Sequence, residues 1–285
     1  GRYSTLEKPD ILTQPGRAES LVCSMASDTV GVMTVTLDRI YRFPVKGMGP
    51  DPLDSVALQE GDGLPFDRHW AVVHGSSKVD PAAPTWAKKA NFLCLARDEK
   101  LAQLDIAFDE ETRTLTVLRK GKQISRARLD DHMGRTLLQT FLAGFMPDGP
   151  RGNPKVVEAP QGVAFTDVEA AKVSIINMAS VRDIERVTRE PVDPMRFRGN
   201  LYLEGLDAWR EFDWIDKQIQ IGDCVLQVLE RIDRCAATNV NPQTGTIDMN
   251  IPLSLRKGFG HIDCGIHTKV VRSGTIKLGD TITVL

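Results

Sequence analysis

The stretch Cys224-Val-Leu-Gln-Val-Leu-Glu-Arg-Ile-Asp-Arg-Cys-Ala-Ala-Thr-Asn-Val-Asn-Pro-Gln-Thr-Gly245 predicts a β-strand that ends in a turn. Its first nine residues run or alternate apolar, as they do in a half-buried strand. Asn241-Pro242 and Thr244-Gly245 favour a turn, because proline fixes φ and glycine admits positive φ. We therefore expect Cys235 to lie where the strand ends.

Short strands separated by turns are predicted on both sides of this stretch. Residues 34–41 form the first convincing strand, residues 104–118 have the pattern of a hairpin, and residues 173–176 and 197–203 read as further strands. Residues 267–285 are short strands punctuated by Ser-Gly and Gly-Asp. Such a series implies a closed or nearly closed barrel, so we predict an α+β fold that is mainly β.

Two helices and one boundary complete the predicted organisation. Asp130 or Asp131 is expected to cap an amphipathic helix, and Ser180, with Asp183 three residues later, a short helix through about Arg189. The Pro/Gly-rich residues 147–154 are the best candidate boundary. We expect a weakly ordered tail over residues 1–32, an N-terminal β domain over residues 33–150 and a β-barrel domain over residues 151–285.

Composition excludes several classes of protein. A net charge of −2 and a pI near 6.3 give no general attraction to nucleic acid or anionic membrane. No apolar run reaches the roughly 20 residues that cross a bilayer, and no secretory signal is evident. The five cysteines are scattered without a Cys-x-x-Cys pair (Cys23, Cys94, Cys224, Cys235 and Cys264), which argues against a disulfide framework, a zinc ribbon or an iron–sulfur cluster. A cytoplasmic location is the simplest expectation.

Cys235 is the first candidate for chemistry. Arg231 and Arg234 lie beside it, and nearby cations favour the thiolate, which attacks electrophiles and binds metals. Thiolate ligands suit soft or redox-active metals. The alternative is a small buried residue that finishes a strand, since buried free cysteine is common.

A second group of candidates is cationic. Lys46 and Arg198 each precede a glycine, which lets the backbone approach a ligand, and Arg68 and Arg196 are two further cations in short motifs. Together they could hold a phosphate, although surface cations paired with nearby acids are the usual case. Ser180 could donate to an anion or simply cap its helix. No Walker loop, Gly-x-Gly-x-x-Gly or Gly-x-Ser-x-Gly motif supports a nucleotide-binding or serine-hydrolase function.

Taken in order, the motifs resemble the MOSC-domain family, and within it the group similar to the mitochondrial amidoxime-reducing component and its bacterial relatives. The resemblance covers residues 34–285. The segments that carry it are Tyr41-Arg-Phe-Pro-Val-Lys-Gly, Asp67-Arg-His-Trp, Phe197-Arg-Gly-Asn-Leu, Ile221-Gly-Asp, the run from Arg234-Cys235 to Pro242-Gln-Thr-Gly, Cys264-Gly-Ile and Gly279-Asp280.

This resemblance implies a molybdenum-cofactor enzyme with a MOSC N-terminal β domain and a MOSC β-barrel. Cys235 would ligate molybdenum and be the catalytic residue. The residues implied to hold the pterin and its phosphate are Lys46, Arg68, Ser180, Arg198 and Asn200, with Arg234 as a further contact. The implied reaction is two-electron reduction of N-hydroxylated compounds. Electrons would come from a separate ferredoxin or flavin-type reductase, and we assign no proton donor.

Two positions depart from the family pattern. Gly199 stands where proline is usual, which is expected to loosen the placement of Arg198, and Asn241 stands where aspartate is common, which removes a charge near the metal loop. The alternative function is a non-catalytic cofactor carrier or a sulfur-transfer module that uses a Cys235 persulfide. Pyridoxal phosphate would then enter only through a separate sulfurase partner.

Overall fold

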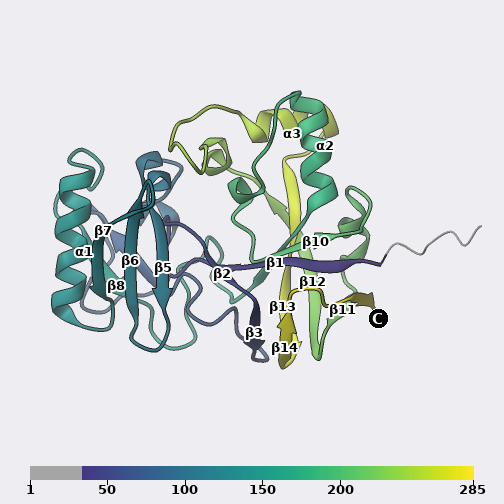
Figure 1. Cartoon of the computed structure of the whole chain (residues 1–285), viewed down its shortest axis with the longest axis horizontal. Helices are drawn as coiled ribbons and strands as arrows, with labels where there is room; N and C mark the ends of the chain where they lie inside the picture. The colour runs from purple at the N-terminus through teal and green to yellow at the C-terminus, as the bar shows by residue number, and fades with distance from the viewer. Residues whose placement is uncertain (1–33) are drawn as a thin grey trace, which may run out of the picture. The chain divides into compact units, whose positions relative to one another are not determined.

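The computed structural model describes residues 34–285, and the tail expected over residues 1–32 lies outside them. The largest element is an eight-stranded sheet (Figure 1). Its strands follow the order β15 (Ile282–Val284), β11 (Gln218–Ile221), β12 (Cys224–Asp233), β13 (Asp263–Arg272), β9 (Val173–Asn177), β10 (Leu201–Glu204), β1 (Thr36–Arg42) and β2 (Asp51–Leu53).

The sheet curls back toward itself. All neighbouring strands are antiparallel except β9 and β10, which are parallel. Thr36 of β1 forms an isolated bridge with Thr281, and the Leu37 amide donates to the Asp280 carbonyl at 2.9 Å, so β1 meets the segment leading into β15. Apolar side chains of these strands fill the interior, which a curled sheet shields from water. The predicted fold class, α+β and mainly β, is confirmed.

Three smaller sheets hold the rest of the strands. The first joins β5 (Asp105–Asp109), β6 (Thr114–Arg119) and β7 (Lys122–Arg128); the second pairs β4 (Trp70–Val73) with β8 (Lys155–Glu158); the third pairs β3 (Ser55–Leu58) with β14 (Gly274–Lys277). The predicted hairpin is β5–β6, whose turn forms because Asp109 Oδ1 accepts from the Glu111 and Thr112 amides. Exposure alternates along β5, so Ile106 and Phe108 face a second core.

Helix α1 (His132–Phe145) packs on β7 and β8 of this second core, at the left of Figure 1. Asp131 caps it as expected, accepting from the Gly134 amide at 3.0 Å. Gly134 must stay small, because a Cβ there would lie 1.8 Å from the Arg128 carbonyl oxygen. Leu138 is buried, whereas Met133 on the same helix is 75% exposed.

Helices α2 (Met178–Thr188) and α3 (Ile251–Phe259) pack together beside the large sheet (Figure 1). The expected cap of α2 is wrong: the side chain of Asn177, not Ser180, accepts from the Ala179 amide, and Ser180 lies within the first turn. The short 3-10 helices are η1 (Lys89–Asn91), η2 (Glu99–Gln103), η3 (Pro194–Phe197), η4 (Arg210–Trp214) and η5 (Ala236–Asn239).

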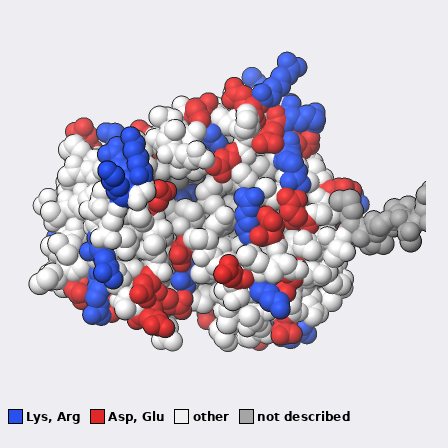
Figure 2. Space-filling model, viewed as in Figure 1, with Lys and Arg blue, Asp and Glu red and all other residues white. Residues whose placement is uncertain are grey.

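Strands from the two sides of the predicted boundary pair with each other. β1 and β2 belong to the large sheet, whereas β8, beyond the Pro/Gly-rich boundary, pairs with β4. Residues 34–285 belong to one compact unit, and the division between residues 150 and 151 stays a prediction. On the face drawn in Figure 2, basic and acidic side chains are interspersed. Among residues 34–285, no helix has the length and apolar character needed to cross a membrane.

Candidate functional site

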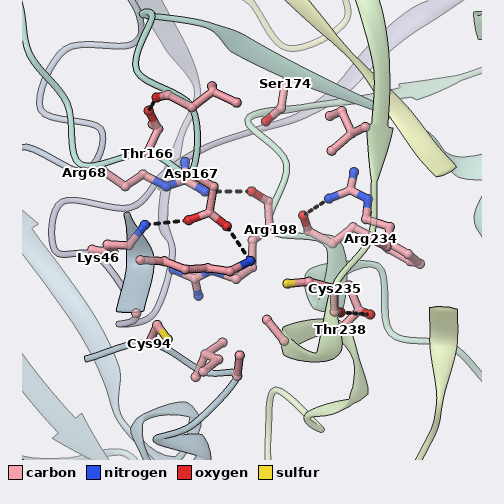
Figure 3. Close-up of a pocket in the computed structure, with 18 of the residues that line it drawn as sticks. Lys46, Arg68, Cys94, Thr166, Asp167, Ser174, Arg198, Arg234, Cys235 and Thr238 are labelled. Atoms are coloured by element: carbon pink, nitrogen blue, oxygen red, sulfur yellow. Dashed lines mark hydrogen bonds and ion pairs between the residues drawn. The ribbon is translucent and has the colours of Figure 1, made fainter. Parts of the chain in front are cut away.

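A cavity of about 330 Å³ brings together most of the candidate residues (Figure 3). It contains residues from far-apart segments, including Lys46 after β1, Cys94 before η2 and Cys235 after β12. Its charged lining residues are mostly basic: Lys46, Arg68, Lys89, Lys172, Arg196, Arg198 and Arg234 against Asp67, Asp167 and Asp233. A low-dielectric cavity lined in this way attracts an anion.

Cys235 stands at the end of β12, as the sequence predicts. It precedes η5 in an extended conformation and is half-buried, with its sulfur directed into the cavity (Figure 3). Its carbonyl accepts from both the amide and the hydroxyl of Thr238, at 3.1 and 2.8 Å. These two bonds fold the chain back after the cysteine and fix the backbone that carries the thiol.

Arg196 holds the rest of this loop. Its guanidinium is buried and donates to the Asn239 carbonyl at 3.1 Å and to Asp248 Oδ1 at 2.7 Å. Asp248 also accepts from the Asn241 side chain at 2.8 Å, and Asn241 Oδ1 in turn accepts from the amide of Gln243. Asn241 therefore anchors the turn, and it is not among the residues that line the cavity.

Arg68 and Arg198 contact the same aromatic ring but differ in their partners. Their guanidinium carbons lie 4.3 and 4.2 Å from the centroid of Phe43, and both line the cavity. Arg68 is paired with Asp67 at 2.6 Å and donates to the Arg198 carbonyl. Within residues 34–285, the Arg198 guanidinium has no hydrogen bond or ion pair. Burial, together with the charge of Arg68, lowers the pKa of Arg198 to about 9.

Gly199 holds Arg198 in place rather than loosening it. The Gly199 amide donates to the Tyr202 hydroxyl at 3.1 Å, and that hydroxyl donates to the Pro194 carbonyl. Proline has no amide hydrogen and could not make the first of these bonds. A Cβ at position 199 would also lie 2.4 Å from Ile176 Cγ1. The residues around position 199 therefore fit glycine rather than the proline that is usual in the family.

Arg234 is the second cation without an acidic partner. Its guanidinium donates to the carbonyls of Cys264 and Phe197, and the described residues give it no ion pair. Burial lowers its pKa, which means that the charged form lacks full compensation. Arg234 directly precedes Cys235, so this uncompensated charge lies close to the thiol.

Asp167 binds two lysines on the cavity wall that faces Arg234 and Cys235 (Figure 3). Its carboxylate accepts from Lys46 Nζ at 2.7 Å and from Lys89 Nζ at 3.4 Å. Burial alone would raise its pKa, but Lys46 and then Lys89 outweigh that effect and lower the pKa to about 2. Burial lowers the pKa of Lys89, yet Asp167 and Cys235 together raise it above the ordinary value. Lys89 and Cys235 line the same cavity.

Asn200 and Ser180 have different positions from the other predicted residues. Asn200 lines the cavity, but its Oδ1 accepts from the Ser174 hydroxyl at 2.9 Å and its amide donates to the Tyr41 carbonyl. Ser180 does not line the cavity: its hydroxyl donates to Glu211 at 2.7 Å and accepts from the Trp209 amide. The structure thus brings together Lys46, Arg68, Arg198, Asn200, Arg234 and Cys235, and leaves Ser180 apart.

Sequence reasoning missed Asp167, Lys89, Cys94 and His267, which also line the cavity. Cys94 and Asp167 lie in irregular segments and Lys89 begins a three-residue 3-10 helix, so no periodic pattern distinguishes them from surface residues. Burial, and then Asp98, raise the pKa of the Cys94 thiol. Within the described chain, no group of three or more His, Cys, Asp or Glu residues could hold a metal ion by itself.

Comparisons with known proteins found one matching family model and several similar chains. Residues 160–283 match the MOSC domain family model. The chain is 29% identical to the mitochondrial amidoxime reducing component 2 of Bos taurus over 132 residues, 42% of this chain and 38% of that protein. It is 23% identical to the mitochondrial amidoxime-reducing component 1 of Xenopus laevis over 302 aligned residues, 94% of this chain and 84% of that protein.

The alignment with the first of these relatives thus spans about two fifths of its length. Among solved structures, the YuaD protein of Bacillus subtilis aligns with 88% of this chain and 96% of its own, with 14% identity and a TM-score of 0.42. The resemblance drawn from the sequence motifs is confirmed, and residues 160–283 of this chain carry a MOSC domain.

Proposed function

We propose that this protein is a molybdenum-cofactor-dependent reductase of N-hydroxylated compounds, with Cys235 as the protein ligand of molybdenum. One observation carries the proposal. Arg198 and Arg234 are cations with lowered pKa values and no acidic partner among residues 34–285, and both line the cavity of Cys235. A half-buried charge without a counter-ion is unfavourable, so an anionic ligand with several acceptor oxygens would stabilise both arginines.

The residues present fit the cofactor that the family resemblance implies. The described residues offer no protein group of three metal ligands, so a metal beside Cys235 needs further ligands from a bound molecule. A pterin dithiolene provides soft sulfur ligands, and its phosphate is a partner for arginine. When bound, the molybdenum and dithiolene supply the two-electron chemistry that removes oxygen from nitrogen.

The chain's own residues would then have separate roles. Arg198, Arg234 and Arg68 would bind the phosphate and pterin, and Lys46 would orient the cofactor from the opposite wall. Thr238 fixes the backbone of Cys235, so that the thiolate is held in one position. Because Ser180 is engaged with Glu211 away from the cavity, we do not assign it a contact with the cofactor.

The balanced reaction is R–NHOH + 2 H⁺ + 2 e⁻ → R–NH₂ + H₂O. The names of the relatives, amidoxime-reducing components, support a substrate with a nitrogen–oxygen bond. The electrons would come from a separate electron-transfer protein of the ferredoxin or flavin-reductase class. All four cysteines of the described chain are free thiols, which agrees with a reducing, cytoplasmic compartment.

The test is the molybdenum and pterin content of protein made in a host that synthesises the cofactor. Near one molybdenum per chain is expected for the wild type and near zero for Cys235→Ser, with the fold retained by circular dichroism. Cys94→Ser is the matched control, because it makes the same change in the same cavity and should keep the metal. Unchanged metal in Cys235→Ser would refute the ligand assignment. Absence of metal and pterin, with a persulfide on Cys235 by mass spectrometry, would favour the sulfur-transfer alternative.

A further inference from the structure

Three neighbouring strands place polar residues in one row at the edge of the cavity. Glu230 of β12 lies opposite His267 of β13, and His267 lies opposite Ser174 of β9. Cross-strand partners share a face of the sheet, so the three side chains point to the same side. His267 and Ser174 line the cavity that contains Cys235, and Lys172, just before β9, lines it as well.

Glu230 orients the imidazole of His267. Nδ1 lies 3.2 Å from Glu230 Oε1, and the same oxygen accepts from Lys172 Nζ at 2.6 Å. An ionised carboxylate only accepts hydrogen bonds, so Nδ1 carries a hydrogen and donates it. The other ring nitrogen, Nε2, has no hydrogen-bond partner within residues 34–285. It is the nitrogen available to gain a proton and pass it on.

Glu230 is open to solvent, whereas His267 is mostly buried and lines the cavity. The side chain of Glu230 is 51% exposed, whereas that of His267 is 18% exposed. The charged groups near the ring are Glu230 and Arg234 from β12 and its end, and Lys172 from the loop before β9. Burial lowers the pKa of His267, the bond to Glu230 raises it, and Lys172 and Arg234 lower it further, with a net decrease. The protonated ring is therefore a stronger acid than an ordinary histidine.

We propose that His267, oriented by Glu230, donates the proton that the oxygen of an N-hydroxylated substrate takes up as its bond to nitrogen breaks. This inference rests on the proposed function. The N–O bond breaks, the oxygen gains the Nε2 proton and a second proton and leaves as water, and the two electrons come from the reduced electron-transfer protein. Solvent beside Glu230 returns the proton to His267. The arrangement is a carboxylate–histidine pair that acts as a general acid.

The test uses cofactor-loaded protein, reduced methyl viologen as electron donor and benzamidoxime as substrate. His267→Gln is expected to lower kcat by about 100-fold or more at pH 6, with molybdenum content unchanged. The wild-type kcat is expected to decrease as pH rises through the pKa of His267, and His267→Gln should lose this dependence. His132→Gln is the matched control, since His132 is an exposed histidine on α1 outside the cavity, and its rate and pH profile should equal those of the wild type.

A second measurement does not depend on activity. The imidazole of His267 is titrated by NMR in metal-free protein and assigned by its absence in His267→Gln. Glu230→Gln should lower the pKa of His267, because the carboxylate raises it in the wild type. The proposal is overturned if His267→Gln keeps the wild-type rate and pH profile, or if Glu230→Gln leaves the His267 titration unchanged. A loaded wild-type protein that reduces no N-hydroxylated compound would instead overturn the proposed function, and this step with it.

Discussion

Replacing Arg198 by methionine should make the metal-free protein more stable while abolishing cofactor binding. The side chain of Arg198 packs on Phe43 without an acidic partner in the described chain. Methionine keeps an unbranched apolar side chain there and removes the half-buried charge. The backbone carbonyl of residue 198, which accepts from Arg68, is unaffected by the change.

The size of the effect follows from the pKa. Lowering the pKa of an arginine from its ordinary value to about 9 corresponds to an upper bound of about 5 kcal/mol of destabilisation while the group is charged. The contact with the Phe43 ring offsets about 1 kcal/mol, and local relaxation offsets more. We therefore expect Arg198→Met to raise the free energy of unfolding by about 1–3 kcal/mol. The unfolded chain binds the proton more tightly, so the gain is constant below pH 9 and decreases as pH rises above it.

Arg68→Met is the matched comparison, because Arg68 contacts the same ring. Its removal leaves the buried carboxylate of Asp67 without a cation, which should lower the free energy of unfolding by about 3 kcal/mol. Urea unfolding of both metal-free variants at pH 7.5, together with molybdenum content after cofactor-competent expression, measures these effects. Both variants should lose the metal. Shifts of stability in the same direction, or full metal content in Arg198→Met, would refute the reasoning.

Three further variants test other contacts. Asp167→Asn should lower stability by about 1 kcal/mol at pH 7, since the half-exposed carboxylate neutralises two lysines; the difference from the wild type in acid titrations should vanish as pH decreases from about 4 toward 2. Asn241→Asp should lower the free energy of unfolding, measured in urea at pH 7, by about 1 kcal/mol, because it places a second carboxylate beside Asp248. The difference from the wild type should decrease below pH 4, and equal stability at pH 7 would contradict this contact. Gly199→Pro should cost about 2 kcal/mol by removing the donor to Tyr202 and crowding the neighbouring strand; a variant with an unchanged thermal midpoint would show that the bond is dispensable.

The sequence predicted the parts of the site that belong to ordered motifs. Cys235 follows a clearly apolar strand, and Lys46 and Arg198 stand beside glycines, so each was recognisable from local pattern. Arg234 and Arg68 were recognised with them. Their meeting in one cavity depends on β1 joining the large sheet, which local pattern does not encode.

The residues that sequence reasoning missed gain their significance from tertiary contacts. In the sequence Asp167 looks like any loop aspartate. Its role depends on its contact with Lys46, which lies 121 positions earlier in the chain. The sequence shows His267 only as one polar residue in a strand. The register between β12 and β13 places it opposite the carboxylate of Glu230, and this pairing cannot be predicted from local pattern. Ser180 was misplaced because Asn177, three residues earlier, offers an equally good cap and begins the helix first.

The strand order has a consequence for dividing this protein into fragments. Residues 160–283 match a family model, yet β1, which covers one edge of β10, lies more than a hundred residues earlier in the chain. A fragment limited to the matched residues would leave Leu201–Glu204 as an open edge with unpaired amides and carbonyls, which promotes aggregation. During synthesis β1 can pair with β2 early, but its other partner, β10, emerges more than a hundred residues later. A fragment with the boundaries of the family-model match is therefore not expected to fold by itself.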